Sequence, residues 1–156
     1  MRAAFWSVDA ELAREAATMP VATSLNVLTH ARYVAVVGSR GYPELDRIGA
    51  LVGALDPRAT VVTGGAPGVD REAERLAGER GLTCAVVRPA GLMPSDYLCR
   101  NTVVVRGSDV VVAFWDGEST GTRDSIAKAL LFHGFCIVAL PSQEPQVWVP
   151  RMKEKR

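Results

Sequence analysis

The chain has 156 residues, 48% of them hydrophobic and 22% charged, which is typical of one soluble globular domain with a buried core. Its formal net charge of +1 gives no sign of a basic stripe, so the charge argues against a nucleic-acid partner. No apolar stretch approaches the ~20 residues that cross a bilayer, and the N-terminus has no signal-peptide pattern. We therefore expect a cytoplasmic protein without a membrane partner, in which the three cysteines stay reduced.

Residues 1–32 stand apart from the regular pattern that follows them. Apolar residues at helical spacing predict one short helix over Val8–Met19, and Pro20 then ends it. We expect this N-terminal arm to pack on the domain or on a second subunit, and we find no chemistry in it.

From Tyr33 onward, short valine-rich runs alternate with helix-like segments. Continuous apolar runs predict strands that are covered on both faces, and their alternation with helices predicts a parallel sheet. The expected fold is α/β, a Rossmann-like doubly wound sheet of about five strands in a three-layer αβα arrangement over residues 33–141, followed by a polar tail at 142–156. The expected strands are Tyr33–Val37, Thr60–Thr63, Thr83–Val87, Asp109–Phe114 and Cys136–Leu140, and the expected helices are Pro43–Leu55, Val69–Arg80, Ser95–Arg106 and Thr122–His133.

The segment Ser95–Arg106 has two conflicting signals. Three consecutive valines at 103–105 would suit a strand, whereas Ser95 as an N-cap and Asp96 in the first turn favour a helix. We predict a helix, with Gly81 as the C-cap of the preceding one.

Three glycine-marked turns each follow a predicted strand and lead into a helix. A helix start exposes unpaired backbone N–H groups, and glycine removes the side chain that would keep a phosphate away from them. Ligands of open parallel sheets bind beyond the carboxyl ends of the strands, so we predict a site there for a nucleotide or a sugar phosphate. The turns are Gly38-Ser39-Arg40-Gly41, Gly64-Gly65-Ala66-Pro67-Gly68 and Gly117…Gly121-Thr122.

The first two turns offer different chemistry. Ser39 can donate its hydroxyl, and Arg40 can hold a phosphate with its guanidinium fork. Asp70, just after the second turn, could favour the helix dipole, accept a ribose hydroxyl, or hold an anion nest in shape. Neither turn is a GxGxxG fingerprint or a P-loop.

Further polar residues surround the third turn. Thr122 is a natural N-cap, Ser119 can meet a phosphate, and Asp116 stands at the mouth of the sheet. On the preceding helix, Arg100 and Asn101 share a face with Tyr97, where they either bind a ligand or form a surface ion pair. The two histidines have no ligands at metal-binding spacing, so we expect no metal site.

Together these segments resemble the SLOG superfamily, named for the Smf/DprA and LOG proteins, and within it the YspA/YpsA-like branch. The resemblance runs from about Tyr33 to Leu140 and rests on Val36–Arg40, Val62–Asp70, Arg100-Asn101 and Ala113–Thr122. It implies a Rossmann-like fold, binding of nucleotides or nucleotide-derived ligands, and self-association as a homodimer or tetramer. The ligand-binding residues that it implies are Gly38, Ser39, Arg40, Gly64, Gly65, Ala66, Gly68, Asp70, Arg100, Asn101, Asp116, Gly117, Ser119, Gly121 and Thr122.

The chain departs from the LOG enzymes of this superfamily at the Pro-Gly-Gly entry of their motif, which Asp116-Gly117 replaces, and at the catalytic position. LOG enzymes and nucleoside deoxyribosyltransferases use a glutamate to cleave an N-glycosidic bond, and alignment on Gly121-Thr122 puts that glutamate at Ser125. Serine cannot act as the carboxylate that stabilises an oxocarbenium-like centre. Asp124 is adjacent but points roughly 100° away around the helix.

Three functions therefore stay open. The first is a sensor or carrier that binds a nucleotide or an ADP-ribose-like ligand, with no particular cofactor implied. The second is a LOG-like or deoxyribosyltransferase-like enzyme acting on a nucleoside monophosphate, with Arg100, Asp116 and Asp124 as candidate catalytic residues. The third is a DNA-processing role by analogy with the DprA branch, against which the near-neutral charge argues.

Overall fold

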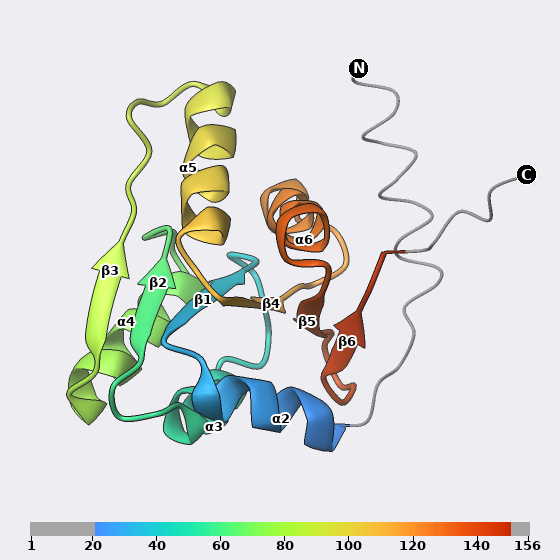
Figure 1. Cartoon of the computed structure of the whole chain (residues 1–156). Coiled ribbons are helices and arrows are strands. Elements are labelled where there is room, and N and C mark those ends of the chain that lie inside the picture. Colours follow the sequence, from blue (N-terminus) through green and yellow to red (C-terminus); the bar gives the residue numbers. More distant parts are fainter. Residues whose placement is uncertain (1–20, 151–156) are drawn as a thin grey trace, which may run out of the picture.

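A six-stranded sheet forms the centre of residues 21–150, the part of the chain that the computed structural model describes (Figure 1). The strand order is β3-β2-β1-β4-β5-β6, and all neighbours are parallel except β5 and β6. The predicted Rossmann-like α/β fold is confirmed. The strands are β1 Tyr33–Gly38, β2 Thr60–Thr63, β3 Thr83–Val86, β4 Val110–Phe114, β5 Cys136–Ala139 and β6 Gln146–Trp148, and the helices are α2 Val21–His30, α3 Asp46–Ala54, α4 Val69–Arg80, α5 Pro94–Arg106 and α6 Thr120–His133.

The helices cover both faces of the sheet (Figure 1). Side chains alternate along a strand, so Val34 and Val36 of β1 enter one hydrophobic core with α2, α3 and α4. Ala35 and Val37 enter the second core, which α5 and α6 complete. This gives the predicted three layers and explains why the central strands are apolar throughout.

Several elements differ from the sequence expectation, and α3 begins at Asp46 rather than at the predicted Pro43. Helix α2 and strand β6 were not predicted, and α6 begins at Thr120 with Ser119 rather than Thr122 as its N-cap. Strand β6 brings part of the expected tail into the sheet, where Trp148 packs edge-on against Trp115 at 6.0 Å between ring centroids. The division at 32 and 141 stays a prediction, and the helix predicted over Val8–Met19 lies outside the described residues.

Helix α5 forms as predicted, but it begins one residue earlier. Pro94 occupies the first helical position, where its missing N–H costs nothing, and the Asp96 carboxylate accepts a hydrogen bond from the Met93 N–H. These start signals outweigh the strand propensity of the three valines. Gly81 is the C-cap of helix α4, as predicted.

None of the helices in residues 21–150 has both the length and the apolar character of a membrane span. The cytoplasmic location inferred from the sequence stays a prediction.

Gly38 ends β1 where α4 crosses the sheet. A Cβ at this position would lie 2.5 Å from the Val69 side chain, which is fully buried. The glycine is therefore required by packing, whatever ligand binds nearby.

We expect Gly38→Ala to lower the free energy of unfolding by about 1–3 kcal/mol, the usual cost of overpacking a core. In a Val69→Ala background the same change should cost much less, because the smaller side chain leaves room for the new methyl group. Urea unfolding of the two single variants and the double variant measures this coupling. Equal costs in both backgrounds would contradict the steric explanation.

Candidate functional site

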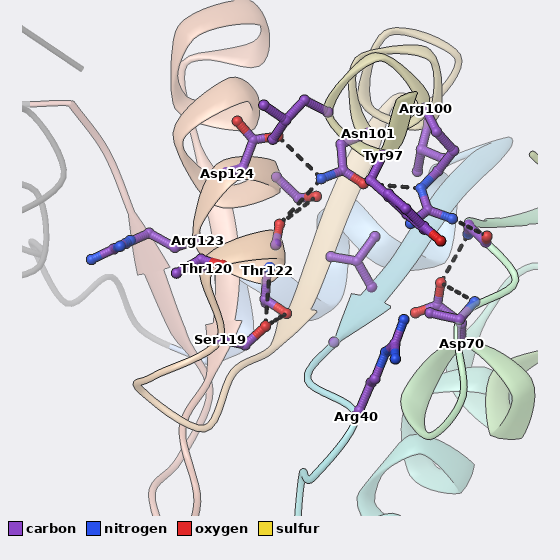
Figure 2. Close-up of a pocket in the computed structure, with 18 of the residues that line it drawn as sticks. Arg40, Asp70, Tyr97, Arg100, Asn101, Ser119, Thr120, Thr122, Arg123 and Asp124 are labelled. Atoms are coloured by element: carbon purple, nitrogen blue, oxygen red, sulfur yellow. Dashed lines mark hydrogen bonds between the residues drawn. The ribbon is translucent and has the colours of Figure 1, made fainter. Parts of the chain in front are cut away.

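A cavity of about 1000 Å³ opens at the carboxyl ends of β1 and β4, where the strand order reverses. This is the switch point at which ligands of doubly wound sheets bind, and the volume is at the upper end of the ~300–1,000 Å³ usual for small-molecule sites. The cavity is enclosed by the turns after β1, β2 and β4 and by helices α5 and α6 (Figure 2). Of the predicted ligand-binding residues, those lining it are Gly38, Arg40, Gly64, Ala66, Asp70, Arg100, Asn101, Asp116, Ser119, Gly121 and Thr122, whereas Ser39, Gly65, Gly68 and Gly117 do not.

Two amides of the turn after β2 are not open to a ligand. The Gly64 and Ala66 N–H groups donate to Asp70 Oδ2 at 2.9 and 3.3 Å. Gly65 and Gly68 have φ values of 70° and 89°, which L side chains rarely adopt, so the turn needs its glycines for its own shape. Our expectation of a free anion nest is wrong here, because the protein's own carboxylate fills it.

Asp70 is therefore held in an unusual environment. Only 4% of the residue is exposed, and burial raises its pKa to about 6, although the two amide hydrogen bonds and the charge of Arg100 lower it. Of the three roles considered from the sequence, Asp70 holds the nest in shape.

The turn before α6 is also held by an internal carboxylate. Asp116 Oδ1 accepts hydrogen bonds from the Glu118 and Ser119 N–H groups at 2.9 and 2.8 Å. Burial opposes ionisation of Asp116, but these backbone hydrogen bonds outweigh it and lower the pKa of the carboxyl group. Ser39, predicted to donate to a ligand, is itself buried and accepts a hydrogen bond from the Asp116 N–H at 3.1 Å.

The N-terminus of α6 keeps free donors. Ser119 Oγ caps the Thr122 N–H at 3.4 Å, but no residue of the described chain accepts from the N–H groups of Thr120 and Gly121. Both residues line the cavity, and a Cβ at Gly121 would meet open space. These two amides and the positive end of the helix dipole form an anion-binding position.

Two arginines face the cavity from the opposite side. Arg100 Nη1 donates to the Gly64 carbonyl, its Nε donates to Asn101 Oδ1 at 3.0 Å, and its guanidinium carbon lies 5.6 Å from the centre of the Tyr97 ring. Arg40 is exposed and has neither a hydrogen bond nor an ion pair within residues 21–150. Figure 2 shows the two side chains pointing toward the same space beside Asp70. Neither arginine has a carboxylate within salt-bridge distance in the described part of the chain, so both charges can meet an anionic ligand.

The candidate catalytic carboxylate on α6 is bound within the protein through one of its two oxygens. Asp124 Oδ2 accepts hydrogen bonds from Asn101 Nδ2 at 3.1 Å and from Lys128 Nζ at 2.7 Å. Ser125 is buried and donates its hydroxyl to the Gly121 carbonyl of its own helix. Lys128 was missed by the sequence analysis, although its i,i+4 spacing from Asp124 is a usable signal.

Comparison with known proteins finds solved structures whose fold is similar to that of this chain. No family model matches the sequence, and no curated protein matches it. The DNA processing protein A of Helicobacter pylori, described for its unique single-stranded DNA binding mode, aligns with a TM-score of 0.55 at 22% identity over 78% of this chain and 69% of its own. The DNA processing protein A of Streptococcus pneumoniae aligns with a TM-score of 0.54 at 20% identity over 73% of this chain and 51%, about half, of its own length.

These neighbours overturn the argument against a nucleic-acid partner. The same fold occurs in a protein that binds single-stranded DNA, so a net charge of +1 does not exclude such a partner. The physical reason is that net charge sums over the whole surface, whereas a phosphate meets only local charges such as Arg40 and Arg100 at the cavity.

The fold-level part of the SLOG resemblance is supported, and the YspA/YpsA-like branch stays a prediction. DNA processing protein A is one of the proteins for which that superfamily is named. The chain shares its α/β fold with that protein.

Proposed function

We propose that the cavity binds a nucleotide or nucleotide-derived ligand through its phosphate and that the protein acts as a sensor or carrier. The observation that carries the proposal is the pairing of two cations with an open helix N-terminus. Arg40 and Arg100 have no carboxylate partner within residues 21–150, and across the cavity the Thr120 and Gly121 amides have no acceptor there.

The cavity suits the remainder of such a ligand as well. One wall of the cavity is apolar and consists of Pro94, Tyr97, Leu98 and Val104. The tyrosine ring offers a face on which a base can stack. An apolar wall with a few convergent polar groups is the usual composition of a cofactor or nucleotide site.

Cleavage of the ligand has weaker support. Ser125 offers no carboxylate, Asp124 is neutralised by Lys128, and Asp116 is held by two backbone amides. Chromatography for free base after incubation with nucleoside monophosphates tests this alternative.

Isothermal titration calorimetry with AMP, ADP, ATP and ADP-ribose tests the binding proposal. We expect Gly121→Val to weaken the binding of the best of these by about tenfold or more, because its side chain covers two donors to a charged oxygen. The fold should be retained, since the new Cβ meets open space. Gly78→Val is the matched control, because Gly78 is also helical and open but lies outside the cavity.

If no compound binds at millimolar concentration, the proposal is wrong. If Gly121→Val binds as tightly as the wild type, the phosphate does not sit at α6.

A second candidate is single-stranded DNA, favoured by the similarity to DNA processing protein A. Fluorescence anisotropy with a labelled oligothymidylate tests it. Affinity that falls steeply with salt and with Arg40→Ala would support a nucleic-acid ligand, because phosphate contacts release counterions. No change in anisotropy at low salt would exclude it.

A further inference from the structure

Lys128 of α6 joins two helices from outside the cavity. Its Nζ donates to Asp124 Oδ2 and to the Leu98 carbonyl of α5, each at 2.7 Å, and its side chain is 13% exposed. Lys128 does not line the cavity, whereas Asp124 and Leu98 do. The lysine therefore balances a carboxylate that borders the proposed ligand position without reaching that position itself.

The same carboxylate orients Asn101. Asn101 is 8% exposed, and its Nδ2 donates to Asp124 Oδ2 and, at 3.3 Å, to the Gly121 carbonyl. With Nδ2 committed to these acceptors, Oδ1 faces the other way and accepts from Arg100 Nε. Figure 2 shows this row of side chains running from Asp124 through Asn101 to Arg100.

The row has a consequence for charge as well as for orientation. Without the lysine, the Asp124 carboxylate would remain on the cavity wall with no cation within salt-bridge distance in the described residues. It would then repel an anionic ligand and compete with it for the arginine. Asp124 can therefore orient the Asn101 amide without repelling the ligand only while Lys128 balances its charge.

We propose that Lys128 is a positioning residue for the phosphate site: it neutralises Asp124 and so allows the carboxylate to fix Asn101, which in turn holds Arg100 toward the ligand. This inference rests on the proposed function. It adds a residue that does not line the cavity.

The test combines three variants with calorimetry, using the nucleotide that binds the wild type best. Lys128→Met should weaken binding by about tenfold or more, because an unbalanced negative charge on the cavity wall then repels the anionic ligand. Asp124→Asn in the Lys128→Met background should recover most of the affinity, because the charge to be balanced is gone. Lys128→Arg should bind nearly as well as the wild type.

The double variant separates positioning from simple structural damage. It still lacks the hydrogen bond from Lys128 to Leu98, so a purely structural role predicts that it binds as poorly as Lys128→Met. That result would overturn the inference, as would undiminished binding by Lys128→Met.

A ligand-free measurement keeps the inference distinct from the proposed function. In the free protein, the NMR resonance of Arg100 Nε–H, assigned with Arg100→Lys, should shift or broaden in Lys128→Met and return in the double variant. If the Arg100 Nε–H resonance is unchanged in Lys128→Met, the positioning role is wrong, whether or not a nucleotide binds. If the wild type binds no nucleotide but this resonance changes as expected, only the proposed function is wrong.

Discussion

Arg100→Ala is expected to weaken nucleotide binding by about 30-fold or more, the consequence of removing one partner of a desolvated charge pair worth on the order of 2–5 kcal/mol. Arg100 is partly buried and its guanidinium is already fixed by the Gly64 carbonyl and by Asn101. Little side-chain entropy is then lost when the ligand binds, so Arg100 should contribute more than the exposed Arg40.

Arg106→Ala provides the matched control for this result. Arg106 lies near the C-terminal end of the same helix, outside the cavity, and contacts the Phe132 ring. The control removes the same charge from the same helix and should leave the dissociation constant within about twofold, because long-range effects of surface charge are screened by salt. Equal losses for the two variants would mean that overall charge, rather than a contact in the cavity, governs binding.

Asp70→Asn is expected to become more stable relative to the wild type as the pH rises from 4 to 7, by about 2–3 kcal/mol. The pKa of Asp70 rises from the ordinary 3.8 to about 6 on folding, so between these values the folded protein binds more protons than the unfolded chain. Wild-type stability attributable to this group therefore falls as the pH rises through that window. Asparagine does not titrate, and its amide oxygen can still accept from the Gly64 and Ala66 N–H groups.

Chemical denaturation of both proteins at several pH values measures this gap. Carboxyl groups elsewhere with lowered pKa, such as those of Asp56 and Glu72, titrate in both proteins and cancel in the difference. Asp116→Asn is a control of opposite sign: the pKa of Asp116 is lowered, so the variant should be less stable than the wild type near neutral pH and lose that deficit in acid. A gap for Asp70→Asn that does not vary with pH would contradict the buried carboxylate described above.

The sequence was sufficient for the five parallel strands and most of the helices, for a physical reason. Strands buried on both faces need continuous apolar runs, and the valines of β1 and β4 supply them. Strand β6 has only three residues, and its place is decided by pairing with β5 and by the packing of Trp148, which no local pattern records.

The position of the cavity could be predicted from the sequence, but its hydrogen bonds could not. The glycine turns mark the switch point correctly, because their place after the strands follows from topology. Whether an acidic side chain turns back onto the preceding amides depends on its rotamer and its neighbours. For that reason Asp70 and Asp116 filled donors that the glycine pattern alone predicts to be open.

The reversal of strand order has one more consequence. Strands β1, β2 and β3 come from residues 33–86, and β4, β5 and β6 come from residues 110–148, so the two halves of the sheet meet along the β1–β4 ladder. The cavity opens at the end of that seam, with Arg40 contributed by one half and the start of α6 by the other. A bound ligand would therefore connect two halves of the sheet that are distant in sequence. The free energy of unfolding should rise with ligand concentration, because the ligand binds only the folded protein.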